Sequence, residues 1–452
     1  MAVASGMCLL DSATAFVQLV PPAISWQGHA GTKNNVIPQA CNSPARQQPR
    51  STRAAIVSMA VAEGAAAADD GGASLPRVLC HGEILFDCIA NPEAAGWGLK
   101  EVEESAAWKA YPGGAPANVA CALAKLGVPA SFVGAVGRDK EGEELLQVLR
   151  DSGVGTELAT TIDDYPTRTV MVTRDVDGDR TFAGFGGGKA SDSFADCQHR
   201  LREMEDAAKG KLKPGAWVVQ GTLGLAYTDS FESHVRLAEW AKEAGAVRYL
   251  DINWRPVFWE LAAGERGEQS AYESLARERI TDFAATADVI KLTDEEAEWL
   301  CGVSGETALL DPSCLQNFFP ASKAILVTAG EKGAAYTIGG HTGFIPVFKS
   351  IEVVETTGAG DAFSAGFVSE AIKFLSAKHK GDIGMAAGGE GEGGAARDMV
   401  RFASAVGALT CCGDGAIKPQ PLHGDVRGLL AAEGASSPAS AAAASAAATT
   451  QS

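Results

Sequence analysis

The chain has 452 residues, of which 46% are hydrophobic and 21% charged, and its formal net charge is −18 at pH 7. This length suits one large α/β domain or two smaller ones. The acidic balance argues against nucleic-acid binding through bulk charge, and no run of about eighteen apolar residues predicts a membrane span. The ten cysteines show neither zinc-ligand spacing nor a disulfide framework. We therefore expect small-molecule ligands, with no nucleic acid and no membrane as partners.

Residues 1–74 differ in composition from the rest of the chain. Up to about Ala62 the only acid is Asp11, and basic, hydroxyl-bearing and small residues fill the segment. This composition is typical of an organelle transit peptide, followed by a linker rich in Ala, Gly and Asp. A disordered tail without a targeting role is the alternative.

Two other segments lack the apolar residues of a packed core. Residues 384–396 are rich in Gly and Glu and are predicted to form a surface-loop insertion. Residues 426–452 are dominated by Ala and Ser and are predicted to be a disordered tail. The folded domain should therefore span residues 75–425.

The first predicted elements carry candidate ligand groups. The apolar run 77–87 predicts the first buried strand of the core. Asp87 comes where this run weakens, which is where open sheets present ligand groups, although a turn residue is the alternative. Further on, Gly113-Gly114 predicts a bend against which a ligand can lie. Asn118 begins the next helix, where it either caps the helix or hydrogen-bonds a sugar hydroxyl.

A strand at 131–137 and a helix at 139–151 continue the βα pattern. Residues 168–173 and 180–183 then predict a β-hairpin around a Gly-containing turn. A small antiparallel sheet between two βα units would form a lid, which we place near residues 165–185.

The middle of the chain predicts strands at 217–220 and 249–253, separated by an amphipathic helix at about 230–244. Asp251, Asn253 and Arg255 alternate along an extended stretch, so all three can point into one cleft. A solvated face is the alternative interpretation of this trio.

Residues 289–300 predict a strand, a cap and a helix, in which Thr293 and Glu296 match a capping box. A further strand is predicted at 324–327. The glycine turn at 328–333 can then meet phosphates or a nucleotide, or it can be a simple hairpin turn.

The stretch 353–363 is the centre of the pattern, with a short apolar strand, the turn Gly358-Ala359-Gly360 and a helix from Ala362. Bare amides and the positive end of a helix make such a turn a binding site for anions. Asp361 lies among these donors. It either caps the helix or takes a proton from a hydroxyl held beside a phosphate.

The last predicted helix runs from Arg397 to Cys411, and the turn 413–415 after it could offer carbonyl groups to a cation. Strands and helices thus alternate over most of the chain, which predicts an α/β fold with a parallel sheet. Ligands should lie at the carboxyl ends of the strands of that sheet.

Two motifs resemble the signatures of the PfkB (ribokinase-like) carbohydrate kinase family. They are residues 113–118 and 356–363, preceded by Gly82-Glu83 and Asp87. The residues of the first motif and those of the segment 290–296 are most similar to the corresponding residues of fructokinases. The resemblance covers about residues 77–421 and implies a three-layer sandwich with a central, mostly parallel sheet and a small β lid.

The activity that this resemblance implies is ATP-dependent phosphorylation of a sugar hydroxyl, with fructose converted to fructose 6-phosphate as the leading interpretation. A plastid stroma is the implied location once the transit peptide is removed. Another acceptor, such as a keto-deoxy sugar acid, ribose or a nucleoside, is the neighbouring alternative. A silent fructokinase-like scaffold in a plastid assembly is the alternative from another class, and the intact Gly358–Asp361 turn argues against it.

The resemblance also assigns roles to residues. The catalytic set comprises the base and the anion hole: Asp361 with Gly358, Ala359 and Gly360. The predicted substrate-binding residues are Asp87, Gly113, Gly114, Asn118 and Arg168. The predicted nucleotide-binding residues are Lys291, Thr328, Gly330 and Gly333. Mg²⁺, held largely by ATP, would be ordered indirectly by Glu296, and K⁺ would bind near Glu355, Thr357 and Gly415. The lid sheets of two subunits would pair in a homodimer.

Three departures from the family pattern bear on these assignments. Glu355 replaces an Asp at the cation site, and Thr293 stands where many members have Asn. Residues 185–189 replace an Arg-containing lid segment, which leaves the identity of the sugar open. An acidic acceptor would require another cation, for which Lys189 and Arg168 are the candidates. A redox role for the adjacent Cys411-Cys412 is a weaker interpretation.

Overall fold

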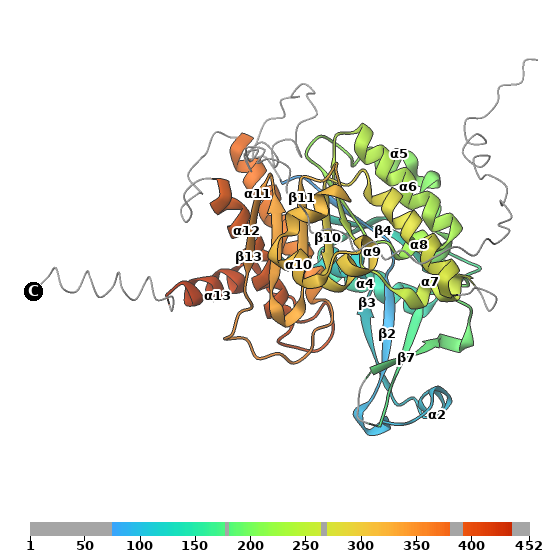
Figure 1. Ribbon diagram of the computed structural model, residues 1–452. Helices are drawn as coiled ribbons and strands as arrows, with labels where there is room; N and C mark the ends of the chain where they lie inside the picture. The colour runs from blue at the N-terminus through green and yellow to red at the C-terminus, as the bar shows by residue number, and fades with distance from the viewer. Residues whose placement is uncertain (1–74, 177–179, 264–268, 380–391, 436–452) are drawn as a thin grey trace, which may run out of the picture. The chain divides into compact units, whose positions relative to one another are not determined.

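The computed structural model describes residues 75–176, 180–263, 269–379 and 392–435 (Figure 1). The predicted transit peptide and linker at 1–74 lie outside these residues. None of the helices in the described ranges combines the length and the apolarity that are needed to cross a bilayer.

The described strands form a main sheet in the order β13-β12-β11-β10-β9-β8-β1-β4-β5. Its members are β1 (Val78–His81), β4 (Ala130–Gly137), β5 (Gly155–Ile162), β8 (Trp217–Gln220), β9 (Val247–Asp251), β10 (Val289–Thr293), β11 (Ala324–Thr328), β12 (Ala334–Ile338) and β13 (His341–Ile345). All pairs from β5 to β11 are parallel, and β12 and β13 add an antiparallel edge. Apolar runs such as β4, where every residue is buried, suit strands that are covered on both faces.

Helices cover both faces of this sheet. One face packs against α3 (Ala115–Lys125), α11 (Ala359–His379) and α12 (Glu392–Thr410). The other face packs against α6 (Thr228–Glu243), α8 (Gln269–Ala284), α9 (Asp294–Cys301) and α10 (Gly305–Leu310). Adjacent residues of β1 point to opposite faces of the sheet, because Cys80 packs in the core on the α3 and α11 side and Leu79 packs in the core on the α6 side. Figure 1 shows α11 and α12 on one side and α6 and α8 on the other. The predicted three-layer sandwich is confirmed.

Five further helices are described, and four of them add buried residues to the cores that cover the sheet, namely Leu145, Ala208, Trp259 and Val426. The five helices are α2 (Leu99–Glu104), α4 (Lys140–Asp151), α5 (Glu205–Lys209), α7 (Pro256–Ala263) and α13 (His423–Ala435). Asp139 caps α4 by accepting a hydrogen bond from Gly142 N at 2.8 Å.

A second sheet forms the lid, with the order β3-β2-β6-β7. Its strands are β2 (Leu85–Ala90), β3 (Trp108–Gly113), β6 (Thr169–Arg174) and β7 (Arg180–Phe185). The β6–β7 pair is the predicted antiparallel hairpin, whereas β2 and β3 were not expected in the lid. In Figure 1 the lid strands β2 and β7 run away from the main sheet, with α2 at their far end.

The prediction of one strand at 77–87 was wrong. The chain breaks at Gly82, whose φ of 148° belongs to glycine, so β1 stays in the main sheet while β2 enters the lid. Asp87 therefore belongs to the lid. The apolar run did not reveal this break, because both halves are buried.

Three other predictions need correction. Val353 and Val354 form no strand and are 61% and 59% exposed; instead, Val354 N donates a hydrogen bond to Cys411 O at 2.8 Å. The helix predicted from Arg397 begins at Glu392, so the last residues of the expected loop 384–396 are helical, and residues 380–391 lie outside the described ranges. The predicted tail from 426 starts inside α13, where Val426 is buried, and only 436–452 lie outside the described ranges. Alanine and leucine favour a helix wherever a core can cover one of its faces.

Candidate functional site

The first turn of α11 and the start of α3 meet at Asp361. Asn118 Nδ2 donates a hydrogen bond to Asp361 Oδ2 at 2.8 Å, and Gln420 Nε2 donates one to the backbone oxygen of Asn118 at 2.9 Å. Asp361 accepts no backbone amide among the described residues, so the helix-cap interpretation is wrong for this carboxylate. The buried Asn118 Oδ1 has no partner in the described structure. Such an acceptor can take a hydrogen bond from a ligand hydroxyl.

The glycine turn before Asp361 is closely packed. Gly358 has a φ of 77°, and a Cβ there would lie 2.7 Å from Ala416 Cβ. A Cβ on Gly360 would lie 3.1 Å from Lys291 Nζ. No described residue accepts the N–H groups of Gly360 and Asp361, which lie in the first turn of α11. These two amides are therefore available to an anion, whereas the Ala359 N–H, which the motif predicted to be bare, donates to Thr356 O at 3.2 Å.

An ion pair lies beneath this turn. Lys291 Nζ donates hydrogen bonds to both carboxylate oxygens of Asp251, at 2.9 and 3.1 Å, and both side chains are buried. Burial lowers the pKa of Lys291, but Asp251 and Glu296 raise it by more, so the ammonium group stays charged. Lys291 thus lies below the turn and is committed to Asp251, a partner that the sequence did not reveal. We call Asp361, Asn118, Asp251 and Lys291 the Asp361 cluster.

The pKa of Asp361 is raised to about 6. Burial is the main cause and Asp251 adds to it, whereas the hydrogen bond from Asn118 and the charges of Lys291 and Arg255 lower the pKa. A carboxylate with this pKa is mostly ionised at pH 7, and it is more basic than an ordinary Asp.

On the lid side, Asp87 approaches Gly113 of the first motif, and the backbone of Glu83 approaches Gly114. A Cβ on Gly113 would lie 2.6 Å from Asp87 Oδ2, and one on Gly114, whose φ is 99°, would lie 2.5 Å from Glu83 O. Glu83 Oε1 accepts the Ala115 N–H at 3.0 Å. The sequence contained Gly82-Glu83, but the prediction gave Glu83 no role. Burial raises the pKa of Glu83 to about 7, and the charges of Asp196 and Asp361 act in the same direction.

Arg168 does not reach this site, which corrects its predicted contact with substrate. Its side chain is fully buried, and its Nε and Nη2 donate to Asp196 at 2.8 and 3.1 Å. The guanidinium group also lies over the rings of Phe185, Phe194 and Phe258. Arg168 is a core residue at the start of the lid strand β6, and a bidentate carboxylate offsets the desolvation of its charge.

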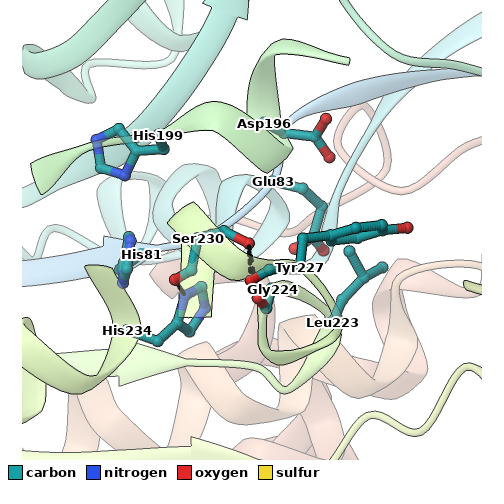
Figure 2. Close-up of a pocket in the computed structure, with 10 residues that line it drawn as sticks. His81, Glu83, Asp196, His199, Leu223, Gly224, Tyr227, Ser230 and His234 are labelled. Carbon is teal, nitrogen blue, oxygen red and sulfur yellow. Dashed lines mark hydrogen bonds between the residues drawn. The ribbon is translucent and has the colours of Figure 1, made fainter. Parts of the chain in front are cut away.

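A small polar cavity lies on the other side of Glu83 (Figure 2). It leaves about 10 Å³ for a water centre, which is room for roughly one molecule. Figure 2 shows three imidazole rings on one side and the carboxyl groups of Glu83 and Asp196 on the other. The rings form the histidine cluster, which we define as His81, His199 and His234.

The histidine cluster is held neutral by burial. The rings of His81 and His234 lie 4.1 Å apart, and those of His81 and His199 lie 5.4 Å apart. Burial lowers the pKa of His199 to about 3 and that of His234 to about 4, and it holds the pKa of His81 well below the ordinary value. No motif in the sequence indicates this cluster, because His81 lies on β1, His199 follows the 3-10 turn Ala195–Gln198 and His234 lies on α6.

The residues predicted to bind nucleotide lie at the ends of β10 and β11. Thr328 pairs with Thr293, and Gly330 and Gly333 follow it with φ values of 49° and 111°. A Cβ on Gly333 would lie 2.4 Å from Ile345 O, so only glycine fits this turn. Thr328, Gly330 and Gly333 thus stay together at one edge, while Lys291 lies beneath the Asp361 turn.

Glu296 forms the predicted capping box with Thr293. Its Oε2 accepts Thr293 N at 2.8 Å, and Thr293 Oγ1 accepts Glu296 N at 3.1 Å. Its Oε1 also accepts Trp254 N at 2.6 Å, a contact that the sequence did not predict. Each carboxylate oxygen therefore already accepts one hydrogen bond, which leaves Glu296 suited to water-mediated contact with a cation.

Two of the residues predicted for a K⁺ site, Thr357 and Gly415, donate hydrogen bonds to the third, Glu355. Thr357 Oγ1 donates to Glu355 Oε1 at 2.6 Å, and Gly415 N donates to Glu355 Oε2 at 3.0 Å. Among the described residues, no group of three or more His, Cys, Asp or Glu side chains is arranged to hold a metal ion. Any cation there would rely on backbone oxygens as well as on Glu355.

These features can be compared with known proteins. The chain matches the family model described as pfkB family carbohydrate kinase over residues 75–422. The chain belongs to the pfkB family. Probable fructokinase-6, chloroplastic, of Arabidopsis thaliana is 32% identical over 360 residues, which cover 79% of this chain and 84% of the relative. Fructokinase-1 of Zea mays is 31% identical over 353 residues, which cover 78% and 97% of the two chains.

A solved structure agrees with this assignment of the pfkB chain. The crystal structure of a fructokinase with bound ATP from Xylella fastidiosa has 25% sequence identity and a TM-score of 0.62, and the match covers 79% of this chain and 99% of that one. The predicted ribokinase-like fold is therefore confirmed. The pfkB chain is an ATP-dependent carbohydrate kinase, with ATP as its co-substrate.

Proposed function

We propose that this pfkB chain transfers the terminal phosphoryl group of ATP to a hydroxyl group of fructose, with Asp361 as the general base. The observation that carries the proposal is the contact between Asn118 and Asp361, which joins the two family motifs at one carboxylate. The raised pKa of Asp361 and the bare amides beside it support the same chemistry.

In this mechanism the sugar hydroxyl gives its proton to Asp361 as its oxygen attacks the terminal phosphorus of ATP. The N–H groups of Gly360 and Asp361 stabilise charge on the phosphoryl oxygens, and Gly358 and Ala359 shape the turn that presents them. Lys291 holds Asp251 in a neutral pair beneath the turn, which keeps a second negative charge from repelling the phosphate. A positioned base of this kind contributes about 10²–10⁴-fold to the rate.

Mg²⁺ would neutralise charge on the phosphate groups of bound ATP. The residues present fit this role only in part, because both carboxylate oxygens of Glu296 already accept hydrogen bonds from Trp254 N and Thr293 N. Glu296 would therefore hold water molecules of the hydrated ion. Thr328, Gly330 and Gly333 would line the side on which ATP enters, whereas Lys291 would stay paired with Asp251 beneath the Asp361 turn.

The acceptor side favours a neutral sugar. Asp87 and the unpartnered Asn118 Oδ1 are acceptors that suit sugar hydroxyl groups, while Gly113 and Gly114 let the sugar approach the backbone. Arg168, one of the two cations considered for the carboxylate of a keto-deoxy sugar acid, is instead buried in a pair with Asp196. Among the acceptors considered, fructose also agrees with the fructokinase relatives.

Three further parts of the proposal concern the setting of the reaction. K⁺ would bind beside Glu355, where Gly415 and Thr357 already meet this carboxylate. Import into a plastid agrees with the chloroplastic relative and with the composition of residues 1–74. Pairing of lid sheets between two subunits would form a homodimer.

A coupled ADP-release assay over a panel of sugars tests the proposal. The wild type should turn over fructose, and Asp361→Asn should lose about 10²–10⁴-fold in kcat, because the amide keeps the shape of the side chain but accepts no proton. Asp398→Asn, an exposed change on α12, is the matched control. Turnover on another acceptor alone would replace fructose. No turnover on any sugar by the folded wild type would favour the scaffold interpretation.

A further inference from the structure

The connection between β9 and α7 departs from the extended stretch that the sequence predicted. The strand ends at Asp251, and Asn253 has a φ of 40°, one of two positive values at non-glycine residues in the described ranges. This left-handed conformation turns the chain sharply, so the expected alternation of Asp251, Asn253 and Arg255 on one face is wrong. Such strained residues persist where the surrounding structure fixes them.

Two hydrogen bonds fix the turn. Ile252 N donates to Lys291 O at 2.9 Å, and Trp254 N donates to Glu296 Oε1 at 2.6 Å. Trp254 also stacks on Trp299, with ring centroids 3.9 Å apart and an interplanar angle of 14°. These contacts hold the backbone before Arg255 next to Lys291 and Glu296. The side chain of Arg255 itself is exposed.

The charges around Asp361 leave a role open for this arginine. Three carboxyl groups, those of Asp251, Glu296 and Asp361, interact with the single ammonium group of Lys291. Lys291 donates to both oxygens of Asp251, so little of its charge remains for a ligand. The phosphate groups of ATP would add more negative charge at the same place.

Arg255 is the other cation that acts on Asp361. Its guanidinium lowers the pKa of that carboxyl group, and its Nη1 donates to Trp254 O at 3.0 Å. No carboxylate of the described residues pairs with Arg255. Its remaining N–H donors form a planar fork of the kind that binds phosphoryl oxygens.

We propose that Arg255 is a further catalytic residue, which binds the phosphoryl group during transfer and is aimed by the turn at Asn253. This inference rests on the proposed kinase function. The bond between the terminal phosphorus and the bridging oxygen of ATP breaks, and ADP leaves with the electron pair. A bond from the sugar oxygen to phosphorus forms, and the proton of that oxygen goes to Asp361. Arg255 stays protonated and donates to the non-bridging oxygens.

Steady-state kinetics of Arg255→Gln and Arg255→Lys test the assignment. Arg255→Gln should lower kcat by about 10²–10³-fold with little change in the KM for sugar, because a transition-state contact is lost. Arg255→Lys should recover part of kcat, since it keeps the charge without the fork. Arg277→Gln is the matched control, because it removes a guanidinium group that lies over the neighbouring Trp299 ring at 4.5 Å.

Two outcomes of these assays would overturn the assignment. One is a kcat of Arg255→Gln within about threefold of the wild type. The other is a raised KM for sugar with kcat unchanged, which would place Arg255 on the acceptor.

Calorimetry keeps this test separate from the test of the kinase function. ADP with Mg²⁺ should bind the wild type more tightly when aluminium fluoride replaces the phosphoryl group, and Arg255→Gln should lose this gain. An equal gain in the variant, or no gain in the wild type, contradicts the role of Arg255 even if no sugar is turned over. If the wild type turns over no sugar but still binds more tightly with aluminium fluoride, and Arg255→Gln loses that tighter binding, the result counts against the proposed acceptor and not against Arg255.

Discussion

The Asp361 cluster and the histidine cluster both lie near Glu83, and both bury ionisable groups. In the Asp361 cluster the groups stay charged, because Lys291 meets Asp251 at 2.9 Å and Asn118 donates to Asp361. In the histidine cluster no described carboxylate forms an ion pair with the rings, so burial lowers the pKa values of His199 and His234 to about 3 and 4.

The difference teaches that burial alone does not make a site for proton transfer. A histidine with a pKa near 3 stays uncharged at pH 7 and does not change its protonation state near that pH. Asp361 lies in the useful range because Lys291 and Asn118 oppose the effect of burial on its pKa. The predictions below break or sharpen this contrast, from the largest expected effect to the smallest.

Removing the central cation should damage the Asp361 cluster most. Lys291→Met leaves Asp251 buried without its partner, and breaking a buried pair in this way costs about 3–5 kcal/mol of unfolding free energy. Urea unfolding measures this loss. We also expect sugar phosphorylation to fall, because the uncompensated Asp251 would lie beside Asp361.

The double variant Asp251→Asn with Lys291→Met is the control for charge. Both charges are then absent, so much of the lost stability should return. If Lys291→Met alone unfolds at the same urea concentration as the wild type, the pair does not hold this cluster together.

The glycine turn gives a smaller effect. Gly358→Ala places a Cβ 2.7 Å from Ala416 Cβ at a φ of 77°, so it should cost about 1–3 kcal/mol and displace the amides beside Asp361. Thermal unfolding and kcat measure the two consequences. Gly428→Ala on α13 is the matched control, because no atom lies within 4 Å of its added Cβ. Equal stability of the two variants would contradict close packing of the turn.

The histidine cluster should make stability depend on pH. Its folded pKa values lie below the unfolded value of 6.5, so the unfolded chain binds more protons once the pH falls below 6.5. Stability is therefore present above pH 6.5 and is lost toward pH 4. His199→Phe removes one such proton, which should reduce the slope by up to about 1.4 kcal/mol per pH unit. An unchanged slope between pH 6 and about 4 would show that His199 is already protonated in the fold.

The sequence predicted those parts of the molecule that local patterns determine. The motif at Gly358–Asp361, the capping box of Thr293 and Glu296, and the β6–β7 hairpin each depend on residues close in the chain. The sequence also placed Asp361 and Asn118 in separate motifs, whose roles followed only from the resemblance to a family, and the hydrogen bond between them emerged from the structure.

Contacts that depend on tertiary packing were missed or misplaced. Arg168 was assigned to substrate because a lone arginine gives no sign of the aromatic rings and the Asp196 that bury it. Lys291 was assigned to nucleotide because its partner Asp251 is forty residues away. The strand predicted at Val353-Val354 failed because its backbone bonds the end of α12 at Cys411 and leaves both side chains exposed.

The pH dependence of kcat/KM for fructose tests the role of Asp361 most directly. The base must be ionised in the free enzyme, so activity should fall as the pH drops through an apparent pKa of about 6. Circular dichroism at each pH confirms that the fold persists, and Glu83→Gln should keep this acidic limb, because it removes a different carboxyl group whose pKa is raised to about 7. An acidic limb near the ordinary pKa of Asp, or one that disappears in Glu83→Gln, would contradict Asp361 as the base.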